Sequence, residues 1–145
     1  MIKVCKNLYQ GNETDAIEAA SGKDIDVIVY IGQDLPDKLS YNCKPPVVHI
    51  PMVDGDNDEL TIHLALLNIS YSVLDDKTLV ACRAGISRSP LLVAAYLAVY
   101  ESDKYTFDKA LNRVRKLNPT FQPEQNLLQA VRKVCKSYFK GEQNG

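Results

Sequence analysis

The sequence has few of the residues from which metal sites and disulfide frameworks are built. It contains no tryptophan, only two histidines, and four cysteines that never form a Cys-x-x-Cys pair. Structural zinc sites usually combine closely spaced cysteines and histidines, so we expect no metal and no cofactor. We also expect no disulfide framework, and we interpret Cys5, Cys43 and Cys135 as small buried apolar side chains.

The chain also lacks an excess of charge and a long apolar run. Its 17 Lys and Arg residues and 18 Asp and Glu residues give a formal net charge of −1, which favours neither a nucleic-acid nor a membrane surface. The longest apolar segment, 90–100, is too short to span a bilayer, and the N-terminus resembles no secretory signal. We therefore expect a cytoplasmic monomer with no nucleic-acid or membrane partner.

Short apolar segments with different periodicities follow one another along the sequence. Strands are predicted at 2–4, 8–10, 25–31, 47–50 and 78–81, and helices at 12–20, 60–74, 90–100, 107–117 and 123–138. This alternation predicts an α/β fold, in which a central, mainly parallel sheet is flanked by helices on both faces. At this length we expect one domain over residues 1–145, with a frayed tail at 140–145.

Several boundaries and one burial pattern can be predicted more closely. Asn12 or Thr14 is expected to cap the first helix, and Pro123 to lie in the first turn of the last one. Residues 32–46 contain three prolines and are predicted to form a loop. Helix 60–74 is so strongly apolar that we expect it to be well buried.

The most informative stretch, residues 82–89, reads Cys-Arg-Ala-Gly-Ile-Ser-Arg-Ser and lies between a predicted strand and a predicted helix. Backbone N–H groups converge at such a junction, and the helix dipole favours a bound anion there. We predict that residues Arg83, Ala84, Gly85, Ile86, Ser87 and Arg88 bind a phosphate group. The Arg88 guanidinium would supply two parallel donors to its oxygens.

Cys82 would add a nucleophile at the floor of this anion site. The helix N-terminus and Arg88 favour the thiolate form, which can attack phosphorus in a bound phosphate ester. The reaction predicted by these residues forms a phosphocysteine, which water then hydrolyses. Ser89 is positioned in the sequence to donate a proton to the departing sulfur.

An acidic segment at 52–59 is the expected source of a general acid. It contains Asp54, Asp56, Asp58 and Glu59, and it follows the predicted strand 47–50. The carboxyl ends of parallel strands meet at one edge of a sheet, so this segment should lie near Cys82. A carboxylic acid there could protonate the leaving oxygen and later activate water.

These residues together resemble a known family. Cys82, Arg88 and Ser89 lie at the spacing of the cysteine-dependent protein tyrosine phosphatases, and the whole motif resembles their dual-specificity branch. Residues 8–11, Leu-Tyr-Gln-Gly, are similar to the Leu-Tyr-Leu-Gly opening of that branch. The resemblance implies a protein tyrosine phosphatase-like fold and a phosphorylated protein or peptide as substrate.

The resemblance also implies a role for one aspartate. In that family the general acid follows an Ile-Pro pair at a strand end, which here makes Asp54 the candidate and leaves Asp56 and Asp58 as alternatives. One residue departs from the family pattern, because Ala81 stands where a histidine usually precedes the cysteine. That histidine helps to order the loop and favours the thiolate, so we hypothesise that Ala81 tunes activity without abolishing it.

Other functions are consistent with parts of this pattern. Ala81 suggests a catalytically weak module that binds phosphorylated peptides. A phosphatase for phosphoinositides or RNA 5′ phosphates would favour extra basic residues, of which the loop has only Arg83. Low-molecular-weight phosphatases and arsenate reductases place the acid after the cysteine, whereas here the acidic segment comes first. The leading hypothesis is hydrolysis of phosphotyrosine, with phosphoserine and phosphothreonine as further substrates.

Overall fold

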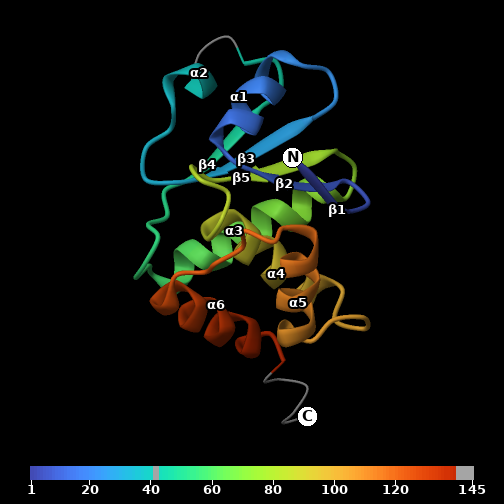
Figure 1. The fold of residues 1–145 in the computed structure, drawn as a ribbon, viewed down its shortest axis with the longest axis vertical. Helices are drawn as coiled ribbons and strands as arrows, with labels where there is room; N and C mark the ends of the chain where they lie inside the picture. The colour runs from blue at the N-terminus through green and yellow to red at the C-terminus, as the bar shows by residue number, and fades with distance from the viewer. Residues whose placement is uncertain (41–42, 140–145) are drawn as a thin grey trace.

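The computed structural model describes residues 1–40 and 43–139, and its centre is a five-stranded sheet (Figure 1). The strands lie in the order β1-β2-β5-β3-β4. Their bounds are β1 (Ile2–Cys5), β2 (Leu8–Gly11), β3 (Val27–Ile31), β4 (Val47–Ile50) and β5 (Thr78–Ala81). All neighbouring strands are parallel except β1, which pairs antiparallel with β2. The mainly parallel sheet is thus confirmed.

Helices cover both faces of the sheet, which confirms the predicted layers (Figure 1). They are α1 (Glu13–Ser21), α2 (Asp37–Ser40), α3 (Glu59–Val73), α4 (Arg88–Tyr100), α5 (Phe107–Leu117) and α6 (Gln125–Ser137). Figure 1 shows α1 and α2 on one face and the other four helices on the opposite face. In the described part of the chain, no helix combines the length and apolarity needed to cross a membrane.

The helix boundaries correct several details of the sequence prediction. Asn12 is the cap of α1: its side chain accepts a hydrogen bond from Asp15 N, and the Asp15 carboxylate accepts one from Asn12 N. Thr14 lies inside the helix. Helix α4 begins at Arg88 rather than at residue 90. Pro123 was expected in the first turn of α6, but that helix begins later because the Glu124 side chain caps it by accepting from Leu127 N.

The prediction of a loop at 32–46 was wrong in one place, because these residues include the short helix α2. Leu39 is buried against the sheet, and its N–H donates to Pro36 O, so a turn of helix forms there despite the prolines. The tail predicted at 140–145 lies outside the described residues.

Helix α3 is only half buried, which corrects the expectation for residues 60–74. One face packs into the main core through Ile62, Ala65, Leu66, Ile69 and Val73. The opposite face is also apolar and is exposed to solvent. Composition alone could not separate the two faces, because after Glu59 helix α3 lacks the charged residues that mark the outer faces of α5 and α6.

The sheet brings four loops together at the carboxyl ends of its parallel strands. Strand β5 lies at the centre between β2 and β3, and β4 follows β3. Because these four strands are parallel, the segments after Gly11, Ile31, Ile50 and Ala81 all leave the same edge. Open α/β sheets bind ligands at these carboxyl ends.

Candidate active site

Cys82 directly follows β5, and its side chain is nearly buried, with 2% of the residue exposed. The backbone N–H of Ser89 donates to the Cys82 Sγ at 3.3 Å, and the Ser89 Oγ lies 3.2 Å from the same sulfur. The Ser89 Oγ also lies 3.1 Å from Gly11 O, to which it donates. The Ser89 hydroxyl has one proton, so it can donate a hydrogen bond either to the sulfur or to Gly11 O. A group that stabilises a departing thiolate needs such a proton within reach of the sulfur.

The loop between Cys82 and Ser89 is oriented by its carbonyl groups, which accept hydrogen bonds from the surrounding framework. The pairs are Glu13 N to Arg83 O, Asn118 Nδ2 and Gln10 Nε2 to Gly85 O, Gln122 N to Ile86 O, and Leu91 N to Ser87 O. Within residues 1–40 and 43–139, the N–H groups of residues 83–87 donate to no acceptor. Five consecutive free donors beside a helix N-terminus are the groups that an anion site requires.

The turn in this loop requires glycine at position 85. Gly85 has a φ of 73°, a conformation that side chains disfavour. A Cβ atom at this position would also lie 3.1 Å from the Asn12 Cβ and 3.2 Å from Gly11 C. The loop therefore packs against the start of α1 so closely that only glycine fits without movement.

Two buried polar side chains that support this loop were missed by sequence reasoning. Gln10 is 2% exposed, and its Nε2 reaches both Gly85 O (3.1 Å) and the Ser89 Oγ (3.0 Å). Asn118 is 7% exposed and donates to the Gln10 Oε1 at 3.0 Å and to Gly85 O at 3.0 Å. The signal for Gln10 was available, because a glutamine occupies a buried strand position where the resembled family has leucine.

Asp54 is the carboxylate of the acidic segment that contacts the Cys82 loop. Its Oδ1 accepts a hydrogen bond of 2.6 Å from the Ser87 Oγ, which in turn accepts one of 2.9 Å from Glu124 N. All three aspartates are exposed, but in the described residues only Asp54 has a side-chain hydrogen bond to the Cys82 loop. The geometry thus favours Asp54 over both alternatives as the general acid.

The acidic segment is held by one internal side-chain bridge and by contacts with the Cys82 loop. The Asn57 side chain bridges it, accepting from Val53 N at 2.9 Å and donating to Val53 O and Gly55 O. Arg88 adds a second link to the Cys82 loop, because its NH1 donates to Met52 O at 3.1 Å. Two hydrogen bonds therefore join the segment to the predicted phosphate site.

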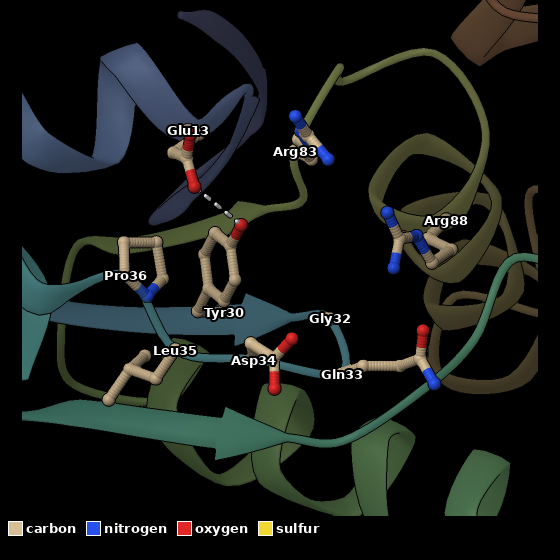
Figure 2. A pocket seen from close by; sticks show the side chains of 9 residues that line it. All are labelled: Glu13, Tyr30, Gly32, Gln33, Asp34, Leu35, Pro36, Arg83 and Arg88. Atoms are coloured by element: carbon tan, nitrogen blue, oxygen red, sulfur yellow. Dashed lines mark hydrogen bonds between the residues drawn. The ribbon is translucent and has the colours of Figure 1, made fainter.

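A cavity of about 310 Å³ lies beside the phosphate site (Figure 2). Figure 2 shows Arg83 and Arg88 on one side and residues 33–36 on the other. At its inner wall, the Tyr30 OH donates to the Glu13 Oε1 at 3.2 Å. Burial raises the pKa of Tyr30 to about 12, so this hydroxyl keeps its proton at neutral pH. Cys82 does not line the cavity, which leaves the space free for the rest of a substrate.

A sequence profile described as "Dual specificity phosphatase, catalytic domain" matches residues 8–136 of the chain. The chain belongs to this family. It therefore carries a phosphatase catalytic domain, and the matched residues include β2, β5, the Cys82 loop and most of α6.

Curated relatives support this assignment. The tyrosine-protein phosphatase vhp-1 of Caenorhabditis elegans is 26% identical over 133 residues, which are 86% of this chain and 20% of the relative. The putative tyrosine phosphatase 123R of Invertebrate iridescent virus 6 is 28% identical over 132 residues, covering 89% and 87% of the two chains. The dual specificity protein phosphatase OPG106 of Vaccinia virus is 30% identical over 101 residues, covering 67% and 58%. The chain thus matches only about a fifth of the length of the nematode protein.

Solved structures share the fold. Human DUSP28 superposes with a TM-score of 0.78 at 18% identity, covering 94% of this chain and 93% of the other. A leucine-rich-repeat and phosphatase-domain protein of Entamoeba histolytica gives a TM-score of 0.77 at 19% identity, covering 99% and 94%. The α/β architecture is therefore that of dual-specificity phosphatases.

The other three cysteines of the phosphatase domain are poor nucleophiles. All four cysteines are free, and burial is the main cause that raises the pKa of Cys5 to about 11 and that of Cys135 to about 12. Burial also raises the pKa of Cys43. These three groups remain thiols at neutral pH, and they lie outside the Cys82 loop. Among the described residues, no group of three or more His, Cys, Asp or Glu side chains could hold a metal ion.

Proposed function

We propose that this domain hydrolyses phosphate monoesters on protein substrates through a phosphocysteine at Cys82. The observation that supports the proposal is the run of N–H groups at residues 83–87 that have no acceptor in the described residues, in the loop that begins at Cys82. Together with Arg88, these donors would hold the three terminal oxygens of the phosphoryl group and oppose its charge during transfer.

The two steps use residues that contact the loop. In the first, the thiolate forms a bond to phosphorus as the ester oxygen leaves, and that oxygen takes the proton of Asp54. In the second, water gives a proton to the Asp54 carboxylate and attacks phosphorus, and the bond to sulfur breaks. The sulfur leaves as the thiolate, which a hydrogen bond from the Ser89 hydroxyl stabilises, and inorganic phosphate is released.

The proposed substrates are phosphotyrosine, phosphoserine and phosphothreonine in proteins of the cytoplasm. The cavity beside the phosphate site supports this choice, because Tyr30, Leu35 and Pro36 offer it an aromatic and apolar wall. Glu13 and Asp34 line the same cavity. Their carboxylates offset the charges of Arg83 and Arg88 in the same lining, so the cavity offers no excess of basic side chains to the further phosphates of a phosphoinositide or an RNA 5′ end.

A panel of substrates tests this proposal. We expect turnover of an aryl phosphate and of phosphotyrosine, phosphothreonine and phosphoserine peptides, with lower kcat/KM for phosphoinositides and 5′-phosphorylated RNA. A wild-type protein that binds phosphopeptides but releases no phosphate from any substrate would instead be a binding module. Preferred turnover of RNA or phosphoinositide would overturn the substrate assignment while leaving the phosphocysteine reaction intact.

The effect of Ala81 is a separate hypothesis. Ala81 is fully buried in the smaller core, which also contains Ala16 and Tyr30, so a larger side chain must displace its neighbours. We expect Ala81→His to shift the pH dependence of kcat/KM for an aryl phosphate, provided that thermal unfolding shows a folded protein. Identical profiles in a folded variant would contradict the hypothesis.

A further inference from the structure

Helix α3 has an exposed apolar face that the phosphatase reaction does not use. Residues 60–74, which include most of the helix, contain no charged side chain. Five of them are large, apolar and exposed: Leu60 (67%), Leu64 (45%), Leu67 (56%), Tyr71 (78%) and Leu74 (73%). A helix that is apolar on all sides is normally covered on all sides.

These five residues, which we call the α3 stripe, follow a regular spacing. The steps between them alternate between four and three positions, which is the repeat of a coiled-coil seam. Residues at this spacing form one continuous row along a helix. The α3 stripe can therefore pack against another helix, with its side chains acting as knobs for the partner's holes.

The area of the α3 stripe is large for a surface that stays exposed. The exposed fractions of its five residues correspond to on the order of 600 Å², the upper end of what a monomer normally leaves in one apolar patch. A groove of about 470 Å³ continues the patch towards the edge strand β4 and is lined by Val27, Pro46, Val48, Leu67 and Tyr71. With this groove, the patch approaches the roughly 800 Å² that each partner buries in a stable complex.

We propose that the α3 stripe is a dimer interface that binds the same stripe of a second copy of this chain. A two-fold interface requires a patch that complements itself, and an uninterrupted apolar seam does so. Coiled-coil pairs that select a different chain use charges beside the seam. Here the flanking residues Thr61, His63, Asn68 and Ser70 include no Asp, Glu, Lys or Arg, and acidic residues lie only at the two ends of the stripe, at Glu59 and Asp75. This proposal replaces the expectation of a monomer and does not depend on the catalytic reaction.

Sedimentation of the wild-type chain at increasing concentration tests the proposal directly. We expect a reversible change from one to two chains, with half-dissociation in the micromolar range. Leu67, at the centre of the stripe, would contact its own counterpart. We therefore expect Leu67→Arg to weaken association by about 100-fold or more, because each dimer would bury two unpaired charges.

A matched substitution separates the interface from general effects of added charge. Tyr100→Arg introduces the same side chain at an exposed apolar residue on α4, outside the stripe, and should leave association unchanged. Both variants should unfold cooperatively and hydrolyse an aryl phosphate like the wild type, because neither residue belongs to the active site. Disulfide formation between Leu67→Cys chains, measured against the wild-type chain, reports whether the two seams meet.

Two results would overturn the proposal. A wild-type chain that stays monomeric from micromolar to millimolar concentration shows that a second copy does not cover the stripe, whatever another protein does. A dimer that persists in Leu67→Arg shows that association uses a different surface.

Discussion

The Cys82 loop and the acidic segment at 52–58 meet at the carboxyl ends of the strands, but the two are held in place differently. The Cys82 loop is fixed by carbonyl groups bonded to the framework, and its Cys82 and Ser89 side chains are buried. The segment at 52–58 exposes its three aspartates and reaches the Cys82 loop through the side chains of Ser87 and Arg88. The framework thus fixes the Cys82 loop, whereas the Asp54 segment is held by the Asn57 bridge and by two side chains of that loop.

Removing the nucleophile should have the largest effect, because nothing else in the rigid loop can replace it. We expect Cys82→Ser to lower kcat by more than about 10⁴-fold in an aryl phosphate assay. Binding of phosphopeptide should persist, since the N–H groups of residues 83–87 do not depend on the sulfur. Cys43→Ser is the matched control and should retain wild-type turnover. Comparable loss in both variants would show that Cys82 has no special role.

Removing the proposed acid, Asp54, should lower kcat by less than removing Cys82, and the size of the loss should depend on the substrate. We expect Asp54→Asn to lower kcat by about 10²-fold for a poor leaving group, and by much less for a leaving group that needs no proton. The amide oxygen can still accept the hydrogen bond from Ser87, so the segment should keep its place. Asp56→Asn and Asp58→Asn provide controls. If either of them shows the leaving-group dependence and Asp54→Asn does not, the acid is assigned to the wrong residue.

One glycine in each loop provides a matched pair for comparing rigidity. Gly85→Ala should lower the free energy of unfolding by about 1–3 kcal/mol and reduce kcat roughly 10- to 100-fold, because alanine disfavours a φ of 73°. A Cβ atom added at Gly55 would meet no other atom within 4 Å, and the φ of Gly55 is not in the left-handed region.

We therefore expect Gly55→Ala to change the free energy of unfolding by less than about 0.5 kcal/mol. Urea denaturation and steady-state rates measure both members of the pair. Equal losses of unfolding free energy at the two positions would show that the Cys82 loop is no more rigid than the segment at 52–58.

Removing the hydrogen bond between Ser87 and Asp54, which links the two loops, should have the smallest effect on kcat. Ser87→Ala deletes the donor to Asp54, and we expect kcat to fall roughly 3- to 10-fold for poor leaving groups, with little change in KM. In the double variant with Asp54→Asn, the Ser87 substitution should have almost no additional effect, because Ser87 positions the acid. Rates of the four proteins form a double-mutant cycle. Additive losses would mean that Ser87 acts on phosphate binding instead.

The sequence predicted the parts of this molecule that depend on local pattern. The parallel sheet, the Cys82 loop and its helix follow from short apolar runs around one motif. Gln10 and Asn118 were missed because their partners lie far away in the sequence: the pairing of β2 with β5 brings Gln10 to Gly85, and Asn118 reaches Gly85 from the end of α5. The outer face of α3 was misjudged for a different reason, since apolarity reports what a helix can pack against and not whether its own chain supplies the partner.

The central position of β5 has a consequence for how the protein folds. Thr78 pairs with Leu8 on one side and with Val27 on the other, so the strand that carries the nucleophile can join the sheet only after two long chain segments have closed. Helices α3 and α4 can form earlier from local contacts. During refolding from urea, helical structure should therefore return before the ability to hydrolyse an aryl phosphate, and catalytic competence should mark the final cooperative step.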